Sequence, residues 1–181
     1  QEQYRPLEKI PLDTFYRAIN QVTPSYIRVE ADEVTYCLHV ILRFEAEKQL
    51  IAGTLPVSEI PEFWNSKMQE LLGIKPRSDT EGCLQDIHWS LGDFGYFPTY
   101  ALGNIFASHF FSAFATENKD WDQEITSGNL AFVREWLKKN VHRWGRTYDA
   151  DELAKKVTGE PLSTDAYCTY LKKKYKAIYN L

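Results

Sequence analysis

The chain has 181 residues, of which 44% are hydrophobic and 14% aromatic, and its 25 acidic and 21 basic side chains give a formal net charge of −4. This composition is typical of one soluble folded domain and excludes a largely disordered chain. A mildly acidic balance also lacks the clustered basic charge that nucleic acid or an anionic membrane surface requires, so neither is expected as a partner.

Helix-start and helix-stop residues recur along the whole sequence. Thr23 and Pro24 are suited to begin a long amphipathic helix, and Gly53 is suited to end it. The stretch from Gly73 to Pro98 is rich in glycine and is expected to form turns and short helical pieces. Helices are expected over residues 13–20, 24–52, 98–116, 130–144, 149–157 and 163–179. Another is expected to start within residues 58–61 and to end at Gly73. No segment alternates like a strand, so the sequence predicts an all-α fold, a single irregular multi-helix bundle over residues 1–181.

Neither a run of about 18 apolar residues nor a charged-then-apolar leader is visible, so no membrane association is expected and the predicted location is cytoplasmic. Cys37, Cys83 and Cys168 form no CxxC pair and are predicted to be free thiols. The only methionine is Met68 and the first residue is Gln1. We therefore expect either that residues were removed from the front or that this is a piece of a longer protein.

A polar stripe follows the expected long helix. It consists of residues spaced by three or four positions: Arg28, Asp32, Thr35, His39 and Arg43. Such a stripe is typical of a solvated helix face with i,i+4 ion pairs. The alternative is a stripe that lines a cleft, where Arg28 would present its planar fork to a carboxylate while Asp32 holds it.

A second constellation lies between Gly82 and Gly103. It combines an amide, an acid, a histidine and several aromatic residues: Gln85, Asp86, His88, Trp89, Tyr96 and Tyr100. Glycine-rich loops that hold such groups often form sites, although simple packing and loop hydrogen bonds remain the alternative. His109 and His142, which lie within expected helices, are interpreted as structural.

No complete catalytic set is visible in these residues. None of the four histidines begins an HExxH motif, and there is no Gly-rich phosphate loop and no GxSxG elbow. Asp32 and His39 are seven positions apart and would give only two ligands to one ion. No metal site is therefore expected within this chain.

Two segments nevertheless resemble a specific family. IRVEAD, at Ile27–Asp32, and GCLQDIHW, at Gly82–Trp89, are similar to the IRxxAD and GxxQDxHW motifs of the thermostable carboxypeptidases, a family of zinc metallocarboxypeptidases. The resemblance continues through GDFGYFPTYALGN, REWL, HRWGR and VTGEPL, and covers essentially the whole chain.

The resemblance implies a mostly helical enzyme, commonly a homodimer, whose deep groove removes single residues from the C-termini of peptides. In that family zinc is held by the two histidines of an HExxH helix and by a later glutamate. All of these precede the region seen here. The resemblance therefore implies a C-terminal portion that binds peptide substrates, holds no zinc itself and is inactive alone.

The resemblance also suggests roles for individual residues in the wall of that groove. Arg28 would bind the C-terminal carboxylate of the substrate. Asp32 would orient Arg28 or a neighbouring residue. His88 and Tyr100 would donate hydrogen bonds to the substrate carbonyl or to the oxyanion, with Tyr96 as the alternative donor.

Three further residues are expected to support these groups. Gln85 and Asp86 would set the tautomer of His88, and Trp89 would form part of the groove wall.

A non-catalytic helical module that binds peptides or a protein partner is the competing hypothesis. A coding frame that continues upstream through an HExxH would favour the enzyme, and a start codon directly before Gln1 would favour the module.

Overall fold

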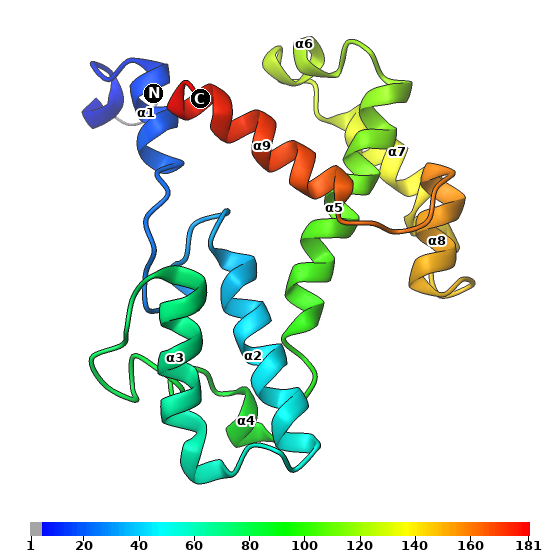
Figure 1. The fold of residues 1–181 in the computed structure, drawn as a ribbon. Coiled ribbons are helices and arrows are strands. Elements are labelled where there is room, and N and C mark those ends of the chain that lie inside the picture. The colour runs from blue at the N-terminus through cyan, green and yellow to red at the C-terminus, as the bar shows by residue number, and fades with distance from the viewer. Residues whose placement is uncertain (1–4) are drawn as a thin grey trace. The chain divides into compact units, whose positions relative to one another are not determined.

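The computed structural model describes residues 5–181, and every regular element in that range is helical (Figure 1). The α-helices are α1 (Leu12–Ile19), α2 (Tyr36–Ile51), α3 (Ile60–Leu72), α4 (His88–Leu91), α5 (Pro98–Glu117), α6 (Trp121–Thr126), α7 (Ala131–Asn140), α8 (Ala150–Thr158) and α9 (Asp165–Tyr179). Single 3₁₀ turns are η1 (Arg5–Leu7), η2 (Arg28–Glu30), η3 (Val57–Glu59) and η4 (His142–Trp144). The predicted all-α fold is confirmed.

The first half of the expected long helix is not an α-helix. Residues 24–35 contain only η2, and α2 begins at Tyr36. The reason is Asp32, whose carboxylate accepts hydrogen bonds from the backbone N–H groups of Val34 and Thr35, both at 2.9 Å. A side chain that satisfies backbone donors in this way favours a helix start over a helix interior.

Other helix boundaries follow local signals closely. Gly73 ends α3 with a φ of 70°, a conformation that glycine adopts without strain. Asp149 and Glu152 form a capping box at the start of α8, as the sequence indicated for Asp149. The expected helix over 130–144 is instead α7 followed by η4, and α6 was not predicted.

Contacts divide the chain into two compact units, each described here by itself. The first runs to Ala101 and includes residues 178–180, and the second covers residues 102–177 and Leu181. That residues 1–181 act as one helical region stays a prediction.

The core of the first unit lies between α2 and α3, which pack side by side (Figure 1). Its α3 residues recur every fourth position and therefore share one face of the helix. The buried core residues are Leu42, Trp64, Met68, Leu72 and Cys83. Cys83 brings the segment before α4 onto this core.

The second unit is held by aromatic packing between α5 and α7. The ring of Phe114 lies 5.6 Å from that of Trp136, and the Trp136 indole N–H donates to Glu117 at 2.7 Å. His109 is buried, and its Nε2 accepts the backbone N–H of Ser163 at 3.0 Å. This arrangement agrees with a structural role for His109.

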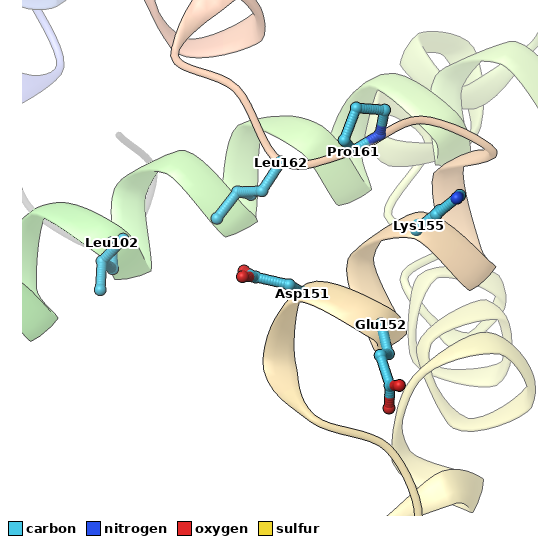
Figure 2. A pocket seen from close by; sticks show the side chains of 6 residues that line it. All are labelled: Leu102, Asp151, Glu152, Lys155, Pro161 and Leu162. Atoms are coloured by element: carbon cyan, nitrogen blue, oxygen red, sulfur yellow. The ribbon is translucent and has the colours of Figure 1, made fainter.

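Figure 2 shows an open pocket of the second unit, with a volume of about 500 Å³. Apolar side chains and charged residues of α8 line it together: Leu102, Asp151, Glu152, Lys155, Pro161 and Leu162. Within residues 5–181, no helix has both the length and the apolar character needed to cross a membrane.

Candidate functional site

One face of α2 carries a row of buried polar side chains. Thr35, His39, Arg43 and Glu47 recur every fourth position, and each is at most 5% exposed. Three of these residues belong to the predicted polar stripe, and its Arg28 is also buried, so the interpretation of the stripe as a solvated helix face is wrong. The row is buried because it faces residues 85–89, which supply partners for its charged members.

Two arginines share one carboxylate in this region. Arg28 donates from Nε and Nη2 to Oδ1 of Asp86, at 3.1 and 2.8 Å, and Arg43 donates from Nε to Oδ2 at 2.6 Å. The Arg28 and Arg43 side chains are 6% and 0% exposed. The three groups together carry a net charge of +1, since two cations meet one anion.

Gln85 joins the same cluster with both ends of its amide. Its oxygen accepts from Arg43 Nη2 at 2.8 Å and from the backbone N–H of Arg28 at 2.9 Å. Its nitrogen donates to the backbone carbonyls of Tyr26 and Glu81, each at 2.9 Å. Gln85 therefore fixes the backbone around Arg28 as well as the Arg43 guanidinium.

Burial and ion pairing shift the pKa values of the cluster in opposite directions. Burial alone would raise the pKa of Asp86, but the charges and hydrogen bonds of Arg43 and Arg28 outweigh it and lower that pKa. Burial lowers the pKa of Arg43 to about 10, against the raising effect of Asp86. For Arg28, burial is outweighed by Asp86 and Tyr36, and the pKa is raised. All three groups are ionised at neutral pH.

His39 lies in the same buried row and is neutral. Burial, and then the nearby charges of Arg43 and Arg28, lower its pKa to about 4. Neither ring nitrogen has a hydrogen-bond partner among the described residues. A third cation beside Arg28 and Arg43 would be uncompensated, so the neutral form of His39 is the one that the cluster accommodates.

His88 and Tyr100 form a direct pair. The two side chains meet through a hydrogen bond of 3.0 Å between His88 Nε2 and the Tyr100 hydroxyl. The ring of Tyr100 also lies over the Arg28 guanidinium, 4.9 Å from centroid to Cζ. The ring centroids of Tyr96 and His88 lie 5.7 Å apart, and Tyr96 is 49% exposed. The structure thus brings the expected donor groups and Arg28 together in one unit.

Three of the expected contacts are different in the structure. Asp32 binds backbone N–H groups, including that of Thr23 at 2.9 Å, and the carboxylate that holds Arg28 is Asp86. Gln85 and Asp86 bind the arginines, whereas the partner of His88 is Tyr100. The expectations that Asp32 contacts Arg28 and that Gln85 and Asp86 contact His88 are therefore wrong, whereas an orienting effect of Asp32 on a neighbour of Arg28 stays a prediction.

Trp89 packs inside the first unit. Its ring stacks on Phe94 with an interplanar angle of 8° and meets Trp64 edge-on at 6.0 Å. Its indole N–H donates to Oε1 of Glu47 at 2.9 Å. Trp89 thus links the segment that carries His88 to the core between α2 and α3.

Sequence reasoning gave Arg43 no role in the site and did not name Glu47, although both bind residues on either side of His88. Arg43 was part of the polar stripe, and Glu47 continues its four-residue spacing. An unbroken row of four such residues was the available signal. What the row faces was not visible, because Arg43 and Asp86 are 43 positions apart in the chain.

The described residues do not fit a metal site. Within residues 5–181, no three His, Cys, Asp or Glu side chains gather closely enough to hold a metal ion. Asp32 is bound to backbone N–H groups and His39 is enclosed beside Arg43, so this pair does not form a site either.

Residues 2–175 match the model of the family described as Carboxypeptidase Taq (M32) metallopeptidase, and the chain belongs to this family. It is 43% identical over 172 residues to Carboxypeptidase 1 of Bacillus subtilis, covering 95% of this chain and 34% of that protein.

Two further relatives match the chain with similar identity and coverage. The chain is 40% identical to Thermostable carboxypeptidase 1 of Thermus thermophilus, covering 98% of this chain and 35% of that protein. The crystal structure of the M32 carboxypeptidase from Deinococcus radiodurans superposes with a TM-score of 0.94 at 36% identity, over 98% of this chain and 36% of that one. The chain thus spans about a third of the length of these relatives.

Proposed function

We propose that this chain is the substrate-binding part of a metallocarboxypeptidase that removes single residues from peptide C-termini. The observation that carries the proposal is the His88–Tyr100 hydrogen bond, made beside Arg28 in a member of the M32 family. Arg28 uses three of the five N–H donors of a guanidinium for Asp86 and Tyr36. The remaining donors and the net charge of +1 would favour a peptide carboxylate.

In this proposal His88 and Tyr100 donate hydrogen bonds to the scissile carbonyl oxygen as it gains negative charge. Such donors stabilise the transition state more than the substrate, and one well-placed donor contributes about 3 to 4 kcal/mol. Tyr96 is the alternative donor and lies against the same histidine ring.

The metal is proposed to be zinc, bound by residues outside the set described here. Zinc would supply a polarised carbonyl and an activated water. Since the described residues do not fit a metal site, the isolated chain is proposed to bind no zinc tightly and to be inactive alone. A homodimeric parent protein is likewise a proposal from the family resemblance, and its cytoplasmic location is a proposal from the sequence pattern.

A chimera tests the proposed function. The matching third of the Bacillus subtilis relative would be replaced with this chain, and release of single amino acids from a peptide with a free C-terminal carboxylate would be measured. We expect activity on that peptide and none on its C-terminal amide. His88→Ala should lower kcat about 10²- to 10³-fold.

The matched control is His142→Ala, which removes an exposed histidine of the second unit and should leave kcat unchanged. A folded, metal-loaded chimera that releases no amino acid would contradict the proposed function. Equal kcat values for the His88→Ala chimera and its parent would contradict the role of His88.

A further inference from the structure

Two buried side chains of α2 bind residues on either side of His88. Arg43 donates to Asp86 at 2.6 Å and to Gln85 at 2.8 Å, on the N-terminal side of the histidine. Glu47 accepts the indole N–H of Trp89 at 2.9 Å, directly after it. Arg43 and Glu47 lie one helical turn apart, so a single rigid element holds both ends of the segment 85–89.

The Arg43 guanidinium has little freedom to move. Its Nη1 donates to the backbone carbonyl of His39, one turn earlier on the same helix, at 2.7 Å. Its Cζ also lies 4.6 Å from the centre of the Trp64 ring. The guanidinium is therefore tied to α2 and α3 while it holds Gln85 and Asp86.

Stability alone is a poor explanation for these two charges. Buried ion pairs are often replaced by apolar residues with no loss of stability, because removing charges from water is costly. Glu47 is only 3% exposed, and its Oε2 is buried without a hydrogen-bond partner among the described residues. Oε1 of Glu47 thus accepts the Trp89 N–H, whereas Oε2 is removed from water without a hydrogen bond in return.

We propose that Arg43 and Glu47 are positioning residues that set where the His88 ring meets Tyr100. Neither needs to touch the substrate, since both act through the residues that flank His88 in the chain. The importance of this positioning for catalysis rests on the proposed function. The positioning itself is a property of this chain and is measurable without activity.

The test uses nuclear magnetic resonance of the whole 181-residue chain. The chain has only four histidines and five tryptophans, so their ring N–H and nitrogen signals are assignable with His88→Gln and Trp89→Phe variants. In Glu47→Ala we expect exchange of the Trp89 indole proton with water to become about tenfold faster. The His88 ring nitrogen signals should shift at the same time.

Glu47→Gln keeps an oxygen that accepts the Trp89 N–H, so it should restore both signals. Arg43→Met should shift the His88 signals through Asp86 and Gln85. Lys67→Met is the matched control, because it removes the Lys67–Glu45 ion pair between α3 and α2 without touching residues 85–89. It should leave the His88 and Trp89 signals in place.

Unchanged His88 signals in folded Glu47→Ala and Arg43→Met would overturn the proposal, as would a shift of equal size in Lys67→Met. If Arg43→Met fails to fold by circular dichroism, Arg43→Lys decides the matter, since it keeps the charge but not the three directed hydrogen bonds. A folded Arg43→Lys chain must still shift the His88 signals, and unchanged signals overturn the proposal. Failure of the proposed function would appear separately, as a folded, metal-loaded chimera that releases no amino acid.

Discussion

Asp86 is the carboxylate that Arg28 and Arg43 share. Both of its oxygens are committed to arginines, and its own side chain is 12% exposed. Exposed ion pairs contribute little to stability, whereas removing one partner of a buried pair leaves an uncompensated charge. The same chemical change should therefore have very different effects at Asp86 and at a surface aspartate.

Asp86→Asn is expected to lower the free energy of unfolding by about 3 to 5 kcal/mol, because two buried arginines lose their only shared anion. Urea denaturation followed by circular dichroism measures this loss. The control is Asp13→Asn, which breaks the exposed Arg17–Asp13 pair and should cost no more than about 1 kcal/mol. Similar losses for the two variants would contradict the account of the cluster.

His39 makes stability depend on pH. Its pKa is about 4 in the folded chain and about 6.5 when exposed, so the unfolded chain binds more protons between these values. Stability is therefore complete above about pH 6.5 and is lost as the pH falls toward 4, by about 3 kcal/mol in all.

Unfolding free energies of the wild-type and His39→Gln chains, measured from pH 7 to 4, check this expectation. In His39→Gln, most of the decrease in the free energy of unfolding between pH 7 and 4 should be absent. His142→Gln, at an exposed histidine, should keep it. The carboxylate of Asp86 contributes at lower pH, since its pKa is held below the ordinary value. A parallel decline in the wild-type and His39→Gln chains would argue against a buried neutral His39.

At the scale of the helices, local signals predicted boundaries well and tertiary pairing poorly. Gly73 and Asp149 were found because their effects depend only on neighbouring backbone. The error at α2 arose because a run without glycine or proline does not reveal that Asp32 binds the N–H groups of the next turn. The motifs at Arg28 and His88 named residues that the structure brings together, but the pairing of Arg28 with Asp86, 58 positions away, depends on tertiary folding.

Asp32→Ala is expected to destabilise the chain by about 1 to 2 kcal/mol, because three backbone N–H groups lose their acceptor at the entry to α2. Thermal unfolding measures the effect. Asp120→Ala is the matched control, since Asp120 precedes α6 without making a side-chain capping bond. The capping account fails if both substitutions shift the unfolding midpoint equally.

At the scale of the whole molecule, the segment around His88 exposes three large apolar side chains to solvent. Leu84, Ile87 and Leu91 are spaced by three and four positions and are 70%, 64% and 65% exposed. Contiguous exposed apolar surface favours association in water. The chain also spans only about a third of its relatives.

We expect the 181-residue chain to self-associate through this surface as its concentration rises. Sedimentation velocity over a range of concentrations should show larger species, and the double substitution of Ile87→Lys with Leu91→Lys should shift the distribution toward the monomer. The control, Val57→Lys with Ile51→Lys, introduces the same charge at two exposed apolar residues elsewhere in the unit and should not shift the distribution. A monomer at every concentration would exclude this expectation.

The shared carboxylate also restricts the order in which this protein can change. Loss of Asp86 leaves two adjacent cations, and loss of Arg43 leaves Gln85 and Asp86 each with one fewer donor. Once Arg43 has become an apolar residue, however, Asp86 faces a single cation. Substitutions at positions 28, 43 and 86 are therefore not independent. Replacing Arg43 first leaves one cation with one anion, whereas replacing Asp86 first leaves two unpaired cations, so we expect the first order to be less destabilising.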